Sequence, residues 1–131
     1  MNLAPSQWLL AGALLAVGIV HLVPMIGVLS AAYLHRLYGV SANSDATTVL
    51  LLRHRAVLFG LLGVLLCLAA FRPHWHFGGA LVGLASMLSF VGLAAGPTPH
   101  APPIRRVVQI DIGLSGLLLI SLAATYLGAG A

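Results

Sequence analysis

The sequence predicts an all-α integral membrane protein, a four-transmembrane-helix bundle with a short interfacial helix in the first cytoplasmic loop. The chain has 131 residues, of which 60% are hydrophobic and 6% are charged, whereas soluble domains carry about 25% charged residues. Four apolar segments also have the length, about 20 residues, that a helix needs to cross a hydrocarbon core. A water-exposed surface cannot be built from this composition, so the lipid bilayer is the solvent that fits it.

The four predicted helices span approximately Trp8–Ser30, Val49–Phe71, Phe77–Ala95 and Val107–Leu127, within a single membrane domain over residues 1–131. The first segment differs from a signal peptide, because no Lys or Arg precedes it and its apolar run is longer than a typical signal core. We therefore expect it to be a spanning helix. Pro24 frees a backbone carbonyl in this helix and is expected to bend it.

Two of the connections have distinctive patterns. Ala31–Tyr38 mixes aromatic and apolar side chains with His35 and Arg36, which predicts a short amphipathic helix in the membrane interface, ended by Gly39. Asp45 is the expected N-cap of the next helix. The connection 96–103 contains four prolines, so we expect it to be extended rather than helical.

The arginines predict the orientation in the membrane. Five of the six lie in or beside the first and third connections, and only Arg72 lies in the opposite turn. The positive-inside rule therefore predicts that the first and third connections lie in the cytoplasm and that both termini lie outside it, which is the periplasm if the membrane is a bacterial inner membrane. The net charge of +4 is interpreted as a topology and lipid-headgroup signal, not as nucleic-acid binding. The expected membrane anchors are Arg36, Arg55, Arg105, Arg106 and Trp75.

The triplet Arg53-His54-Arg55 lies at the start of the second predicted helix, in a chain with only two acidic residues. A charge at the centre of a membrane helix costs about 2.5–3.5 kcal/mol on insertion scales, so a retained charge marks a candidate site. A stripe of small residues, Ala56, Gly60, Gly63, Cys67 and Ala70, continues from Arg53 and is typical of a helix face that packs inside a bundle. We therefore expect Arg53 to point inward. Arg55 lies about 200° around the helix and is expected to face the lipid headgroups.

Asp111 is the expected partner of Arg53, because both enter the membrane to a similar depth from the cytoplasmic boundary. Ser115 lies one turn further along the face of Asp111. The pair has two interpretations: a structural ion pair between the second and fourth helices, or a polar pocket for an anionic or polar headgroup. His54 lies between the two arginines and is a candidate member of this polar cluster.

His21 lies near the middle of the first predicted helix. It either lines a ligand site beside the Pro24 bend, or forms a hydrogen bond to a backbone carbonyl or to a serine such as Ser86 or Ser89. No cofactor is predicted; haem b held by His21 and His54 is a weaker alternative, since their depths differ by about 6 Å. No metal site is predicted, because His74 and His76 lack a third ligand. The one cysteine, Cys67, excludes an internal disulfide.

The composition and these residues favour a non-enzymatic membrane protein. It would bind a lipid, a quinone or another amphiphile, or a partner membrane subunit, through the cluster of Arg53, Asp111, His21, His54 and Ser115. The alternative is a membrane-embedded enzyme, an isomerase or redox enzyme, that uses His21 as acid and base on a lipophilic substrate. The spacing Gly79-x-x-x-Gly83 allows a homo-oligomer to pack through that face.

The runs Leu37-Tyr38-Gly39-Val40 and Leu51-Leu52-Arg53-His54-Arg55-Ala56-Val57-Leu58-Phe59-Gly60 resemble small bacterial four-helix inner-membrane proteins of the DoxX-like and related families, whose function is unknown. The resemblance implies a bacterial inner membrane and supplies no catalytic residues. Some of these proteins are labelled phosphopantetheine adenylyltransferase. That enzyme is a soluble α/β nucleotidyltransferase with a His-x-Gly-His motif, and no such motif occurs in this sequence.

Overall fold

The computed structural model describes residues 4–28, 30–39, 45–97 and 99–127. Its elements are α1 (Pro5–Leu22), the 3-10 segment η1 (Val23–Val28), α2 (Ala31–Tyr38), α3 (Ala46–Ala70), the 3-10 turn η2 (Pro73–Trp75), α4 (His76–Ala94) and α5 (Pro102–Tyr126). Four helical stretches are long and apolar enough to cross a membrane: Pro5–Val28, Ala46–Ala70, Pro73–Ala94 and Pro102–Tyr126. The prediction of an all-α four-helix membrane bundle is confirmed.

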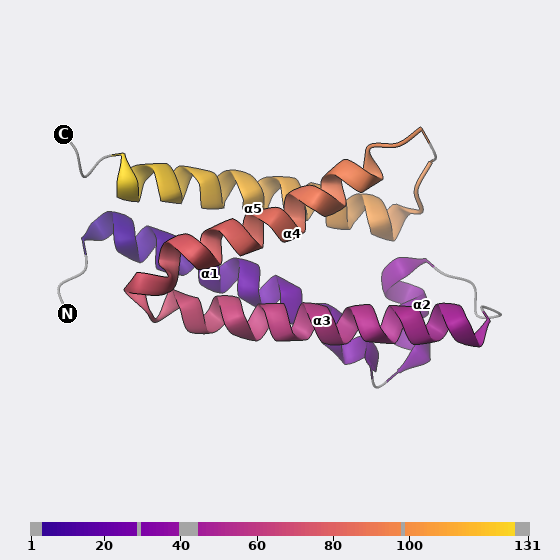
Figure 1. The fold of residues 1–131 in the computed structure, drawn as a ribbon. Coiled ribbons are helices and arrows are strands. Elements are labelled where there is room, and N and C mark those ends of the chain that lie inside the picture. The colour runs from indigo at the N-terminus through magenta and orange to yellow at the C-terminus, as the bar shows by residue number, and fades with distance from the viewer. Residues whose placement is uncertain (1–3, 29, 40–44, 98, 128–131) are drawn as a thin grey trace.

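The helices form two neighbouring pairs, α1 with α3 and α4 with α5 (Figure 1). The first turn of α1, the last turn of α5 and η2 lie at one end of the bundle. The short helix α2 and the connection between α4 and α5 lie at the other end. Helix α1 contacts α3, α4 and α5, and its span has the largest buried share of the four, so we describe it as the central helix of the bundle.

Glycines let α1 and α3 approach each other closely. A Cβ atom added at Gly63 would lie 2.7 Å from the backbone oxygen of Gly18, and one added at Gly18 would lie 2.6 Å from Sγ of Cys67. The small-residue stripe predicted on α3 faces α1, and its members Ala56, Gly60, Gly63 and Ala70 are buried. Small residues bring membrane helices together because packing, not water exclusion, drives their association.

The apolar core fills the space between the helix pairs. Its fully buried side chains come from α1, α3, α4 and α5, and include Leu10, Leu14, Val17, Leu66, Met87 and Leu118. A smaller cluster lies at the α2 end, where Ala56 packs against Val28, Leu37, Leu52 and Ile104. This second cluster connects α2 to η1, α3 and α5, and it bounds the site described below.

Several sequence-based boundaries need correction: α3 begins at Ala46, three residues earlier than predicted, and two other helices begin earlier at prolines. Helices α1 and α5 begin at Pro5 and Pro102, three and five residues earlier than predicted. Proline is well suited to the first helical position, where its missing N–H would have no partner. The prediction that the connection 96–103 is extended throughout is therefore wrong for its last two residues, which form the first turn of α5.

Several local predictions are confirmed. Helix α2 spans Ala31–Tyr38 and ends at Gly39, whose φ of 65° is the left-handed conformation that glycine adopts readily. The side chain of Asp45 caps α3 by accepting a hydrogen bond from the Thr48 N–H at 2.7 Å, and this bond lowers the pKa of the Asp45 carboxyl. The α-helical part of the first span ends at Leu22, and the chain continues past Pro24 as the 3-10 segment η1.

The face that carries Gly79 and Gly83 packs inside the chain. A Cβ at Gly79 would lie 2.9 Å from Ala69, and one at Gly83 would lie 3.4 Å from Leu118 and 3.6 Å from Leu66. The proposal of a homo-oligomer through this face is therefore wrong, because α3 and α5 already cover it.

The close approach of α1 and α3 predicts different effects for two glycine substitutions. Gly63→Ala should lower the free energy of unfolding by about 1–3 kcal/mol, because the methyl group meets a backbone oxygen that cannot move alone. Gly12→Ala is the control, since a Cβ there would have no atom within 4 Å. Thermal unfolding followed by circular dichroism in one detergent compares the two, and equal losses would contradict this account of the interface.

Candidate functional site

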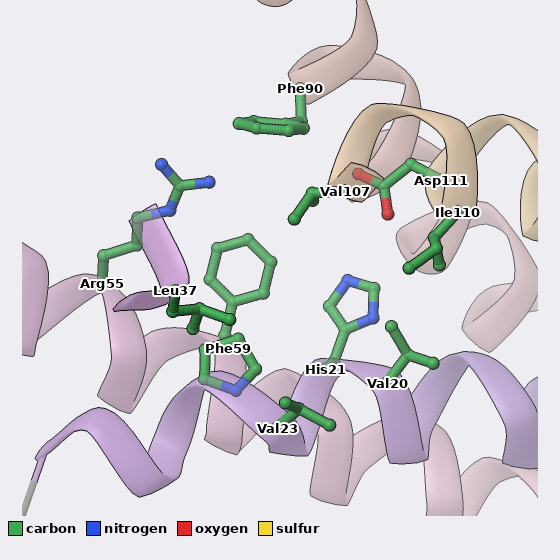
Figure 2. Close-up of a pocket in the computed structure, with 11 residues that line it drawn as sticks. Val20, His21, Val23, Leu37, Arg55, Phe59, Phe90, Val107, Ile110 and Asp111 are labelled. Atoms are coloured by element: carbon green, nitrogen blue, oxygen red, sulfur yellow. The ribbon is translucent and has the colours of Figure 1, made fainter. Parts of the chain in front are cut away.

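A cavity of about 200 Å³ lies inside the bundle near its α2 end, and every long helix contributes to its wall. Its lining combines eight apolar side chains with three ionisable ones (Figure 2). The lining residues are Val20, His21, Val23, Pro24, Leu37, Arg55, Phe59, Phe90, Val107, Ile110 and Asp111. Because α1 ends at Leu22 and the chain then turns into η1, the cavity occupies the space beside the end of the central helix.

His21 forms one wall of the cavity, and both of its ring nitrogens have partners. Its Nδ1 lies 2.9 Å from the backbone oxygen of Val17, and its Nε2 lies 3.2 Å from Oγ of Ser86 on α4. A carbonyl can only accept, so Nδ1 donates, and in the neutral ring the Ser86 hydroxyl donates to Nε2. The ring also stacks on Phe59, with centroids 5.2 Å apart. His21 is thus a fixed, buried side chain.

Of the two residues proposed as partners of His21, Ser86 fills the role. Ser89 instead donates to the backbone oxygen of Ser86 at 2.9 Å. For His21 to act as an acid or a base on a substrate, its Nε2 would first have to exchange Ser86 for that substrate. The geometry therefore favours a structural or ligand-lining role for this histidine.

Arg55, not Arg53, is the arginine of the site. Its guanidinium carbon lies 5.1 Å from the centroid of the Phe59 ring and 4.9 Å from that of Phe90. At these distances the ring faces attract the cation. The side chain of Arg55 is half-buried, whereas that of Arg53 is exposed. The prediction that Arg53 points inward is therefore wrong, and Arg55, which was expected to face outward, lines the cavity instead.

The error has a physical reason, since α3 has two buried faces instead of one. The small face packs on α1, and the face of Arg55, which also carries Phe59, Leu62 and Leu66, packs toward α4 and the core. Leu66 is fully buried because the glycines of α4 make room for it. On the small face, Ala56 packs against Leu52, which lies four residues earlier on the same helix. Arg53 is not part of this packed cluster.

Asp111 contributes the negative charge of the cavity. Its side chain is 7% exposed, and the carboxylate points into the cavity (Figure 2). Arg55 is close enough to attract it electrostatically. Within the part of the chain that the structure describes, no hydrogen bond reaches this carboxylate. Because Asp111 lines the cavity, a molecule that enters the cavity is able to donate hydrogen bonds to the carboxylate.

The other predicted members of the polar cluster lie elsewhere. Ser115 is buried, its Oγ has no hydrogen-bond partner among the described residues, and it does not line the cavity. His54 is exposed, so the structure does not bring it into one pocket with His21, as haem b would require. In the described ranges no three His, Cys, Asp or Glu side chains gather as a metal site would need.

Two further histidines and three arginines lie outside the cavity. His76 is buried and its Nε2 lies 3.2 Å from the backbone oxygen of Ala70. His74 is exposed and meets the edge of Trp75, which is itself 44% exposed. The arginines predicted as anchors, other than Arg55, are exposed as expected: Arg36, Arg105 and Arg106.

Sequence reasoning missed the aromatic part of the site. Phe59 follows Arg55 by one helical turn, and this spacing is a usable signal for a contact between them. Phe90 and Leu37 come from other helices, and nothing in the local pattern connects them to the cavity. Their contribution depends on how α4 and α2 pack against α3.

The hydrogen bond between His21 and Ser86 predicts unequal effects for two serines of α4. Ser86→Ala should lower the free energy of unfolding by about 1 kcal/mol, because Nε2 of His21 loses its partner between helices. Ser89→Ala is the matched control and should cost less, since Ser89 bonds only within its own helix. Thermal unfolding in detergent measures both, and an equal or larger loss for Ser89→Ala would contradict the assignment.

Comparison with other proteins adds nothing to this geometry. No family model, no curated protein and no solved structure matches the chain. The resemblance to DoxX-like membrane proteins therefore stays a prediction from the sequence. The function has to be argued from the fold and from the cavity with His21, Arg55 and Asp111.

Proposed function

We propose that this membrane-embedded protein binds an amphiphile, whose polar head enters the cavity and contacts Asp111 and Arg55. The observation that carries the proposal is the side chain of Asp111, which is 7% exposed and whose carboxylate points into the cavity and has no hydrogen-bond donor in the described part of the chain. A charge kept in an apolar bundle normally has a partner or a function. A bound polar head would supply the missing donors.

The size of the cavity supports an amphiphile over a compact polar ligand. Its volume of about 200 Å³ is below the roughly 300–1,000 Å³ of sites that enclose a whole drug-sized ligand. Only a headgroup or one ring fits inside. The rest of the ligand would extend past the apolar side chains of the lining, such as Val23, Leu37 and Ile110, into the bilayer.

The contacts around the cavity favour binding over catalysis. His21 is held by Val17, Ser86 and Phe59, and Arg55 is held against two phenyl rings. Side chains fixed in this way are prepared to receive a ligand with little loss of conformational entropy. The expectation that the first and third connections lie in the cytoplasm rests on the distribution of the arginines, and the expectation of a bacterial inner membrane rests on the resemblance to DoxX-like proteins.

The binding proposal is tested by purification in a mild detergent followed by native mass spectrometry. We expect the wild-type protein to retain an amphiphile in stoichiometric amount. Asp111→Asn and Arg55→Gln should each lower the retained fraction by about tenfold, the effect of losing one charge-assisted hydrogen bond. Arg53→Gln is the matched control, because Arg53 is exposed and lies two residues from Arg55. An empty wild-type protein, or equal losses in all three variants, would contradict the proposal.

The proposed orientation is tested by cysteine labelling in a Cys67→Ala background. His74→Cys lies in the η2 turn and Pro99→Cys in the connection between α4 and α5, and both positions are exposed. In spheroplasts an impermeant maleimide should label His74→Cys, while Pro99→Cys should react only after the membrane is permeabilised. The reverse pattern would place both termini in the cytoplasm.

A further inference from the structure

We propose that the headgroup bound in this cavity is zwitterionic, with a primary ammonium a short linker away from a phosphate, as in phosphatidylethanolamine. This inference deepens the proposed function and depends on it. It rests on the two opposite charges that line one small cavity, Arg55 on α3 and Asp111 on α5. Figure 2 shows them on different sides of the cavity, with Phe59 and Val107 between them.

The charge of the lining selects against ligands with one charge. An anionic headgroup would be attracted by Arg55 but repelled by the carboxylate of Asp111. A cationic headgroup would be attracted by Asp111 but repelled by Arg55. His21 adds no charge when neutral, the form in which Nδ1 donates to Val17 and Nε2 accepts from Ser86. A headgroup that carries both charges is attracted by both Arg55 and Asp111. Its own opposite charges also attract each other, which lowers the free-energy cost of removing them from water.

The carboxylate of Asp111 decides which kind of ammonium fits. It is an acceptor with no donor among the described residues, and a primary ammonium offers three N–H donors. A quaternary ammonium such as that of choline carries the same charge but has no N–H to donate. The site is therefore expected to distinguish ethanolamine from choline, although both lipids are zwitterionic.

Arg55 suits the phosphate end of the head. A guanidinium is planar and presents N–H donors in a fork that matches two phosphate oxygens. Contacts with the faces of Phe59 and Phe90 orient the guanidinium plane. These rings, with Val20 and Leu37, also leave an apolar path for the glycerol and acyl chains that follow the phosphate.

The test compares lipids of identical acyl chains on the delipidated full-length protein, by native mass spectrometry. We expect phosphatidylethanolamine to bind about tenfold more tightly than phosphatidylcholine or phosphatidylglycerol, since only it donates N–H groups to Asp111. Asp111→Asn should remove the preference over phosphatidylglycerol, Arg55→Gln should weaken both lipids, and Arg53→Gln should leave the preference unchanged. Thermal unfolding of each variant checks that it is folded.

The outcomes separate this inference from the proposed function. Stoichiometric binding of an amphiphile without preference for phosphatidylethanolamine would contradict the inference of a zwitterionic headgroup, but it would not contradict amphiphile binding. No bound amphiphile in any form would overturn both. Free phosphoethanolamine at millimolar concentration should not displace the lipid, because it lacks the acyl chains. Displacement at micromolar concentration would show that the site binds a soluble phosphate ester and would contradict the lipid as the source of the headgroup.

The comparison of ethanolamine with choline needs no variant. It therefore tests the preference for a primary ammonium even if Asp111→Asn fails to fold.

Discussion

The close approach of α1 and α3 is the constraint on which the rest of the structure depends. Backbone atoms of Gly18 and Gly63 nearly touch, so these two helices act as a rigid pair. This contact makes α1 the central helix and leaves the large face of α3 to pack toward α4. The α-helical part of the first span ends at Leu22, and the cavity lies beside this end and beside η1, whose Val23 and Pro24 line it.

The treatment of polar groups follows from the apolar surroundings. Several hydroxyl and imidazole groups inside the bundle bond nearby carbonyls: Ser121 donates to Leu117, Thr125 donates to Ser6 and Ser121, and His76 bonds Ala70. Against this background Asp111 is conspicuous, because its carboxylate accepts no hydrogen bond from the described residues. The hydroxyl of Ser115 is also buried without a partner among the described residues, but a charge inside an apolar bundle costs more than a hydroxyl. The contrast identifies the cavity as the place where a ligand would lower the free energy most.

Much of the candidate site could be predicted from residue types, and its arrangement could not. The scarcity of charge marked Asp111 and the Arg53-His54-Arg55 triplet, and the serine pair of α4 was recognised as a source of partners for His21. Choosing between Arg53 and Arg55 required knowing that α3 has two buried faces. A stripe of small residues reveals the first of these faces. The second, with Phe59 and Leu66, resembles a lipid-facing surface in sequence, because large apolar residues suit lipid and protein cores equally.

The sequence by itself determined the class of the protein, its helices and the caps at Gly39 and Asp45, because hydropathy, glycine and an acidic N-cap act locally. Only the tertiary structure decided which arginine enters the site. It also decided that Gly79 and Gly83 serve internal packing, and that Phe59 and Phe90 flank the guanidinium. The physical reason is that, in a bilayer, an apolar helix face can contact either the lipid or the other helices of the bundle without a large difference in free energy. Orientation then depends on the fit between helices, which involves residues far apart in the chain.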